Sequence, residues 1–278
     1  MISLTFGLMA ALCWGLHDFV VRDVARKAPA LPLLALVLGF GAVLLGPLTL
    51  IDGWGGMTPR AMGIAALSGG VYVLGCFGLY RAFAIGPVGL VSPICGAYPL
   101  VTLLLAMAAG REIGGREWFA VALVVGGIAL VAGHREPGQG ARLAAILWAT
   151  LGATGFALTF QLGQIAAREG GDLAVTLVAR LVALMLVLAV LSVQRQRLAP
   201  ALPHWRPLSL MGALDMGALS LVLASGSLPR PEYAAVASSL FGVVTILLAW
   251  RFLNERLGRV QALGVAVVFA GIALLAAG

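Results

Sequence analysis

Charged side chains are scarce in this chain. Only 10% of its 278 residues are Asp, Glu, Lys or Arg, whereas 61% are hydrophobic, and the mean hydropathy is +1.04. A water-soluble globule of this length cannot bury so large an apolar fraction. The shortage of charge therefore excludes a soluble protein and indicates a protein of the lipid bilayer.

Residue patterns that bind metals or carry out catalysis are also missing. The three cysteines, Cys13, Cys76 and Cys95, have neither paired spacing nor a nearby histidine cluster, so we expect them to be small packing residues. The chain has no DxxD-like cluster, HExxH or GxSxG motif. We therefore expect no metal, no cofactor and no enzymatic activity. An intramembrane enzyme that modifies lipids is the less favoured alternative.

The chain has instead many long apolar runs. A helix of about 20 apolar residues satisfies its own backbone across about 30 Å of hydrocarbon. The loops between the runs are short, which leaves no room for a soluble catalytic domain. We predict an all-α membrane protein with ten transmembrane helices, at residues 2–22, 32–51, 61–83, 88–109, 118–133, 143–166, 173–193, 207–228, 233–253 and 260–277.

The second half of the sequence repeats the first. The run Gly-Ile-Ala-Leu occurs at 127–130 and again at 271–274, each time after a loop that contains a glutamate. A shift of 143 residues places Tyr98 over Phe241, and the early tryptophans Trp14 and Trp148 also match. We therefore predict two five-helix repeats, residues 1–135 and 141–278.

Five is an odd number, so the second repeat must lie upside down relative to the first. Two inverted repeats are the architecture of secondary transporters. We predict a multi-pass transporter that moves a small organic solute across the inner membrane by alternating access. A flippase for a lipid-linked substrate shares the inverted repeat and is the alternative. The sequence is compatible with a monomer or a homodimer.

The net charge of +7 does not indicate a nucleic-acid partner. The arginines lie mainly at the ends of predicted helices, where they meet lipid headgroups of the bilayer. Loops after odd-numbered helices hold most of the Lys and Arg residues. By the positive-inside rule, this distribution favours both termini outside the cytoplasm.

Three ionisable residues qualify as lying at mid-membrane depth within predicted helices: Asp18, Arg180 and Asp215. Each costs about 3 kcal/mol at mid-membrane depth, so such groups persist where they pair or face water. Asp215 is the main candidate for substrate binding and for carrying a coupling proton. The repeat shift matches it with Tyr72, so the two are expected to face one central cavity. Arg180 lies at a similar depth, and both an internal ion pair with Asp215 and a role in substrate binding stay open.

The pair His17-Asp18 is a further candidate for proton coupling. Arg22 follows Asp18 by four residues on the same helix face, so a local Asp18–Arg22 pair is favoured over that role. Histidine is the side chain whose charge changes near neutral pH, which would support coupling if His17 faced the cavity.

Aromatic residues at several depths could line the cavity. Trp14 and Trp148 lie well inside their helices, where lining and packing are equally expected. Tyr98 directly precedes Pro99 in a helix also interrupted by Pro93. A proline inside a membrane helix kinks it and frees carbonyl groups, so Tyr98 is expected at the cavity.

Several of these features resemble the drug/metabolite transporter superfamily, specifically its ten-helix EamA type. The marks are the paired Trp14 and Trp148, the run Tyr80-Arg81-Ala82-Phe83, and Glu255-Arg256 before a Gly-Ile-Ala-Leu helix, where the first half reads Arg111-Glu112. The resemblance implies inverted repeats around a cavity for amino acids, other metabolites or drugs. It adds Tyr80 to the candidate substrate-binding residues. It also implies cytoplasmic termini, contrary to the charge distribution.

Overall fold

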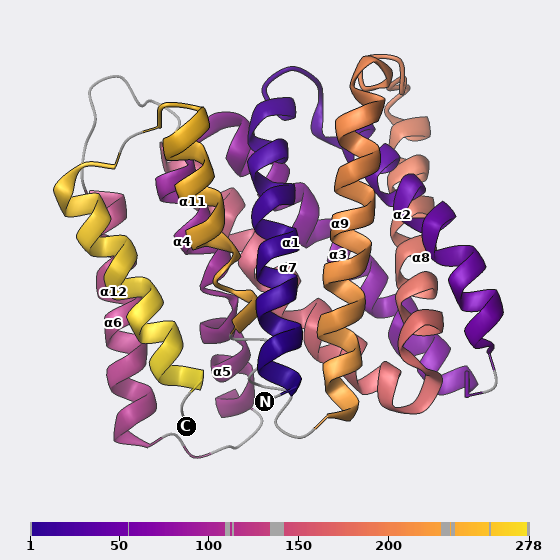
Figure 1. Ribbon diagram of the computed structural model, residues 1–278, viewed down its shortest axis with the longest axis horizontal. Helices are drawn as coiled ribbons and strands as arrows, with labels where there is room; N and C mark the ends of the chain where they lie inside the picture. The colour runs from indigo at the N-terminus through magenta and orange to yellow at the C-terminus, as the bar shows by residue number, and fades with distance from the viewer. Residues whose placement is uncertain are drawn as a thin grey trace.

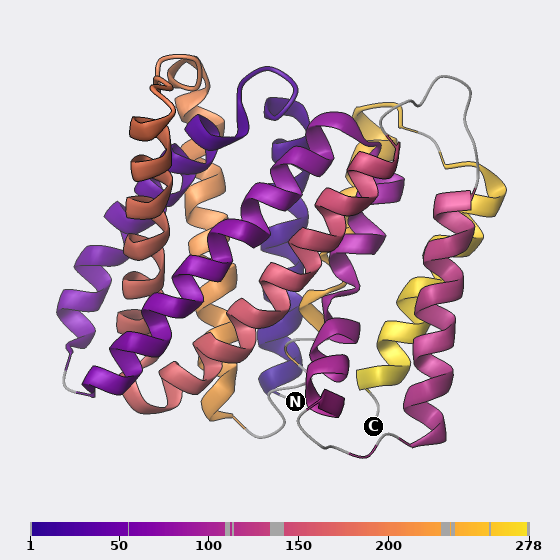
Figure 2. The ribbon, with the colours of Figure 1, turned by 180° about the vertical axis from the view of Figure 1, so that it is seen from behind.

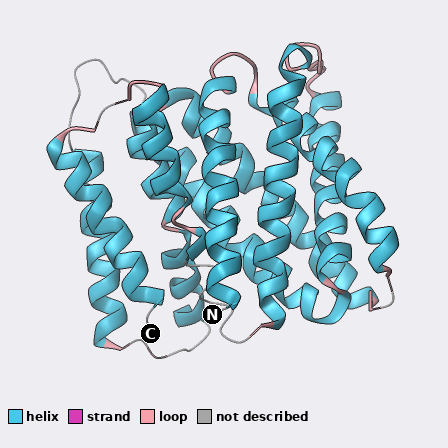
Figure 3. Cartoon of the chain, viewed as in Figure 1, coloured by secondary structure: helices cyan, strands magenta, loops and turns pink. Residues whose placement is uncertain are grey.

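The computed structural model describes residues 2–54, 56–108, 112, 114–133, 142–228, 234, 237–255 and 257–276. Across these residues the regular secondary structure is entirely helical (Figure 3). The first half contains α1 (Ile2–Val24), α2 (Ala30–Asp52), α3 (Pro59–Ile85), α4 (Val88–Gly96), α5 (Tyr98–Ala108) and α6 (Gly115–Gly133). The second contains α7 (Arg142–Gly170), α8 (Asp172–Val193), α9 (Trp205–Ala224), α11 (Phe241–Phe252) and α12 (Arg259–Ala276), with 3-10 turns η1 (Leu202–His204) and η2 (Ser225–Ser227).

Most of these helices can cross a bilayer. By length and composition, seven segments qualify: α1, α2, α3, α4 together with α5, α7, α8, and α9 with its flanking turns. α11 and α12 are shorter apolar helices. The prediction of an all-α membrane protein is confirmed, and the predicted helices overlap the observed ones within a few residues at most boundaries.

The two halves run in opposite directions. In Figure 1, α1 and α6 rise from the lower edge, whereas α12 descends beside α6. Figure 2 shows α7, the counterpart of α1, descending across α3. The packing has the same symmetry, because α3 lies on α7 as α9 lies on α1, and α2 and α6 each pack against their own counterparts, α8 and α12. The fold is a pair of inverted five-helix repeats.

Two predicted helices are interrupted near mid-membrane. α4 ends at Gly96 and α5 begins at Tyr98, because Pro99 has no N–H to donate and its ring collides with the carbonyl one turn earlier. In the second half, Ala234, Ala237 and Ser238 are helical, and α11 begins at Phe241 after a turn at Ser239 and Leu240. Tyr233 and Ala277, predicted ends of the last two helices, lie outside the described residues, as does the 134–141 junction.

Glycines bring the central helices into backbone contact. A Cβ on Gly155 of α7 would lie 2.4 Å from the amide nitrogen of Gly75 on α3. α2 and α9 meet in the same way, since a Cβ on Gly212 would lie 2.9 Å from the nitrogen of Gly41. Small residues allow such close approach between membrane helices. These crossings hold the helices that carry the buried charges.

Candidate functional site

Asp215 of α9 is the centre of a buried polar network. Its side chain is nearly inaccessible, at 4% exposure. Trp14 Nε1 donates to Oδ1 over 3.1 Å, and the Tyr72 hydroxyl donates to the same oxygen over 2.5 Å. Arg180 Nη2 donates to Oδ2 over 2.7 Å. Three donors from α1, α3 and α8 thus hold one carboxylate, and they come from both halves of the chain.

Arg180 forms the ion pair with Asp215 and stands behind it. The guanidinium is fully buried, and its Nε and Nη1 atoms have no hydrogen-bond partner among the described residues. It fits beside Gly41, where a Cβ would lie 2.4 Å from Nη1. Neither Arg180 nor Tyr72 lines the central cavity. Both contact Asp215 without lining the cavity.

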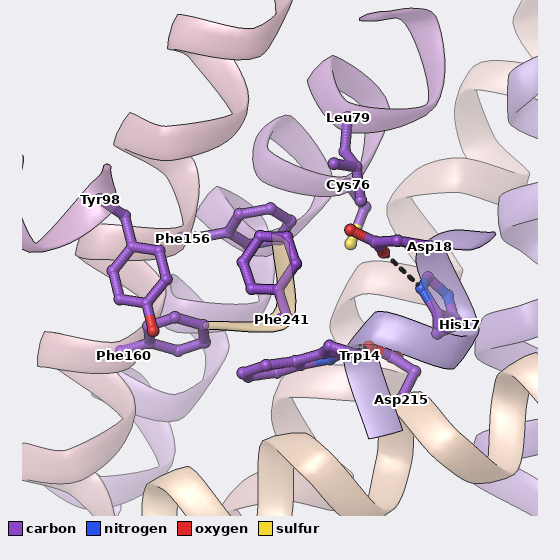
Figure 4. Close-up of a pocket in the computed structure, with 10 residues that line it drawn as sticks. All are labelled: Trp14, His17, Asp18, Cys76, Leu79, Tyr98, Phe156, Phe160, Asp215 and Phe241. Atoms are coloured by element: carbon purple, nitrogen blue, oxygen red, sulfur yellow. Dashed lines mark hydrogen bonds and ion pairs between the residues drawn. The ribbon is translucent and has the colours of Figure 1, made fainter. Parts of the chain in front are cut away.

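A small cavity lies in front of Asp215. It offers about 20 Å³ to water, room for about one molecule. Any larger solute therefore requires the surrounding helices to move apart. Figure 4 shows the lining residues: Trp14, His17, Asp18, Cys76, Leu79, Tyr98, Phe156, Phe160, Asp215 and Phe241.

Aromatic rings form one wall of this cavity. Trp14 stacks on Phe160 with ring centres 5.3 Å apart, and Tyr98 meets Phe160 edge-on at 5.0 Å. Phe156 lies parallel to Phe160 at 6.1 Å. Tyr98 and Phe241 are the first residues of α5 and α11, so the two helix breaks deliver equivalent aromatics to the cavity.

His17 and Asp18 of α1 line the same cavity and bind each other. His17 Nδ1 lies 2.8 Å from Asp18 Oδ1, and the Tyr80 hydroxyl lies 3.5 Å from His17 Nε2 (Figure 4 shows the first contact). The predicted pairing of Asp18 with Arg22 is wrong. Arg22 instead binds Glu255, in the segment after α11, and the carbonyl of Phe83 on α3.

Those partners form a cluster at one end of the bundle, which we call the end cluster: Arg22, Glu255 and the backbone of Phe83 and Val88. Arg22 Nε donates to Glu255 Oε1 over 2.7 Å, and Arg22 Nη1 donates to the Phe83 carbonyl. The Val88 amide donates to Glu255 Oε2 over 2.9 Å. The end cluster joins α1, α3, α4 and the segment after α11 beside a polar pocket of about 330 Å³.

Comparison with known proteins assigns this arrangement to a family. The sequence profile of the EamA-like transporter family matches residues 1–133 and 143–277. The chain belongs to the EamA-like transporter family. This EamA-like protein is therefore a multi-pass membrane transporter of the drug/metabolite transporter superfamily.

Solved structures share the EamA-like fold. A chain described as "Crystal structure of protein" superposes with a TM-score of 0.71 at 16% identity, and the match covers 98% of this chain and 95% of that one. At this identity the likeness shows the fold alone. No curated protein matches the sequence.

The structure separates all the predicted site residues of this EamA-like protein except Trp148 into two groups. Trp14, His17, Asp18, Tyr98 and Asp215 line the cavity. Tyr72, Tyr80 and Arg180 contact lining residues but do not line the cavity themselves.

Trp148 lies apart from the cavity. Its ring meets Phe77 edge-on at 5.4 Å, and the guanidinium carbon of Arg81 is 5.8 Å from the ring centre. Trp148 is therefore a packing residue in this conformation, unlike its repeat partner Trp14.

Sequence reasoning missed the role of Arg22 and five lining residues: Cys76, Leu79, Phe156, Phe160 and Phe241. Phe156 and Phe160 are four residues apart on α7, a spacing that marks one helix face. Phe241 could have been found from Tyr98 by the repeat shift. Cys76 was predicted to be a packing residue, and in the structure it also lines the cavity. The only sequence feature that pointed to the partner of Arg22 was Glu255, in the loop before the last helix.

Proposed function

We propose that this protein is a secondary transporter that carries a small organic solute across a bacterial-type inner membrane by alternating access. The halves, residues 1–135 and 141–278, would rock about the central cavity. The observation that supports this is the Asp215 network, because its donors come from both halves. Buried charges are costly in a membrane and are retained mainly where they serve a pathway. The hydrogen bonds of a network that joins the two halves would change when the halves move relative to each other.

The contacts suggest a role for each candidate. Trp14, Tyr98 and Asp215 would touch the solute, because they line the cavity. Arg180 and Tyr72 would position Asp215, to which both donate. Tyr80 would position His17 in the same way, and Trp148 would support the fold.

The place of a coupling proton is also a proposal. A proton on Asp215 stays a prediction, and the contacts argue against it, since protonation would weaken bonds from three donors at once. The pair His17–Asp18 has no arginine or lysine partner in the described part of the chain. We therefore place the proton on this pair.

The matched tryptophans provide the test. Thermal-shift screening of a solute panel would first identify a ligand, and counterflow in proteoliposomes would then measure exchange. Trp14→Phe removes the donor to Asp215 but keeps a ring, so we expect exchange to fall by about tenfold or more, as for a hydrogen bond to a charged group. Trp148→Phe is the control and should stay within about twofold, since its ring only packs. Equal losses in both variants, or no exchange by folded wild-type protein, would contradict the proposal.

A further inference from the structure

We propose that the polar pocket beside the end cluster is a second binding site, separate from the central cavity, and that it takes a phosphate oxyanion. The inference goes beyond the proposed transport function, and its test does not depend on that function. It follows from the excess positive charge of the pocket, from one unpaired guanidinium nitrogen and from two helix N-termini.

The pocket lies where four helices end or begin. α1 and α11 end at this edge of the bundle, and α4 and α12 begin there (Figure 1). The pocket holds about 330 Å³, which is room for a small ligand, and none of its lining residues lines the central cavity. Its polar side chains are Arg22, Arg26, Asn254, Glu255 and Gln261.

The wall of the pocket carries one net positive charge. Glu255 pairs with Arg22 over 2.7 Å, so these two charges cancel. Arg26 has neither a hydrogen-bond partner nor an ion-pair partner in the described part of the chain, and its charge repels that of Arg22. Asp23 of α1 is already bound to Lys27 at 2.6 Å. No described side chain therefore balances the charge of Arg26.

The charged groups of the wall have unused donors but no unused acceptors. Arg22 is only 2% exposed, and it donates through Nε to Glu255 and through Nη1 to the Phe83 carbonyl. Its Nη2 has no acceptor among the described residues, and an unsatisfied buried donor is costly. Both oxygens of Glu255 are occupied, by Arg22 and by the Val88 amide. The wall is therefore suited to a ligand that accepts hydrogen bonds.

Two helix N-termini add to the positive potential. The first turn of a helix carries partial positive charge and binds anions through its amides. α4 begins at Val88, and the next residue, Gly89, lines the pocket. α12 begins at Arg259, and Gln261 in its first turn also lines the pocket. Gln261 accepts from the Gly258 amide over 2.9 Å through its Oε1, which leaves its NH₂ group as a donor.

A phosphate group matches this set of donors. Arginine binds phosphate through two parallel hydrogen bonds, and such charge-assisted bonds are stronger than neutral ones. Phosphate has more acceptor oxygens than a carboxylate, and three donor groups line this one pocket: Arg26, Nη2 of Arg22 and the NH₂ group of Gln261. A lipid headgroup and a soluble phosphate ester both offer this chemistry. Because α1 and α12 belong to different halves, a bound phosphate would also link the halves at this end.

Calorimetry on the purified full-length protein tests the site. The protein would be held in phosphatidylcholine nanodiscs and titrated at constant ionic strength with inorganic phosphate and with glycerol 3-phosphate. Glycerol is the uncharged control. We expect one equivalent of either phosphate to bind and glycerol to give no signal. The Kd should rise when NaCl is added, because salt screens the attraction between the phosphate and the arginines.

Variants of Arg26 assign the binding to this pocket. Arg26→Gln should weaken the binding of glycerol 3-phosphate by about tenfold or more, as for the loss of a hydrogen bond to a charged group. Arg26→Lys keeps the charge and should bind within about threefold of wild type. Arg197→Gln is the matched control, because it removes an exposed arginine outside the pocket, and it should bind like wild type. Since Arg26 is also exposed, the ligand-free variants should melt like wild type.

A second set of nanodiscs separates the two sources of phosphate. These discs contain phosphatidylglycerol, whose headgroup is an anionic phosphodiester. If lipid headgroups fill the pocket, phosphatidylglycerol will raise the melting temperature of wild type more than that of Arg26→Gln, and the soluble probes will not bind in these discs. If soluble phosphates fill the pocket, they will bind in both kinds of disc. Either result supports the site.

Three outcomes would overturn the inference. The first is that neither phosphate binds and phosphatidylglycerol stabilises wild type and Arg26→Gln equally. The second is unchanged binding by Arg26→Gln. The third is an equal loss in Arg26→Gln and Arg197→Gln, which would mean that phosphate responds to the overall charge of this end of the bundle. Counterflow through the central cavity is measured separately, so these outcomes leave the transport function untouched.

Discussion

Removal of Arg180 should destabilise the fold more than removal of any other contact to Asp215. Arg180→Gln leaves the carboxylate of Asp215 buried with only Trp14 and Tyr72 as donors. Breaking a buried ion pair by deleting one partner costs about 3–5 kcal/mol in the free energy of unfolding. Tyr72→Phe removes one hydrogen bond to a charged group and should cost about 1.5–3 kcal/mol.

The double variant Arg180→Gln/Asp215→Asn separates the charge effect from the loss of packing. It removes both charges, so the remaining polar groups are neutral and their burial costs less. We therefore expect it to be more stable than Arg180→Gln alone. Arg60→Gln is the matched control, because Arg60 forms an exposed ion pair with Glu169 at 3.1 Å, which contributes at most about 1 kcal/mol.

Unfolding by SDS in mixed detergent micelles, followed by circular dichroism, would measure these differences. The reasoning would be refuted if Arg180→Gln unfolded like Arg60→Gln, or if the double variant were less stable than either single one. The first result would mean that Asp215 has another counter-charge. The second would mean that packing, rather than charge, dominates this part of the protein.

Two further predictions address packing and topology. Gly155→Ala should lower the free energy of unfolding by about 1–3 kcal/mol or more, because its Cβ would overlap the backbone of α3. Gly126→Ala is the control and should have little effect in the same SDS titration, because no atom lies within 4 Å of its Cβ position. Cysteines that replace Lys27 and Gln196 should react with a membrane-impermeant maleimide added on one side of the membrane, and a cysteine that replaces Trp54 should react with it on the other side. Labelling of Lys27→Cys and Gln196→Cys from opposite sides of the membrane would contradict the inverted repeats.

Most of the fold could be predicted from the sequence, because apolar length alone identifies membrane helices. The repeat shift also indicated the meeting of Tyr72 and Asp215, since equivalent residues near a twofold axis lie close to each other. The break at Gly96 was signalled by Pro99. The break before Phe241 was not, because Gly242 stands where the first half has Pro99.

The polar partners were harder to predict. Arg22 lies four residues after Asp18, which favours a pair within one helix. In the fold, Glu255 and the Phe83 carbonyl offer Arg22 two acceptors from other segments. Local spacing contains no information about such acceptors. The same limit applies to Trp14 and Trp148, which match in sequence but have different neighbours.

Among the residues that the structure describes, the end cluster has no equivalent in the other half of the repeat. The repeat match that pairs Trp14 with Trp148 places Phe156 at the position of Arg22, and Glu112, the counterpart of Glu255, is exposed. In the proposed alternating access, the movement that closes this end would form the Arg22–Glu255 salt bridge, whereas the described residues offer no equivalent pair for the reverse movement. The two conformers of the proposed cycle would then differ in energy, so an unloaded molecule would rest facing one compartment, and the apparent affinity would differ between the two sides.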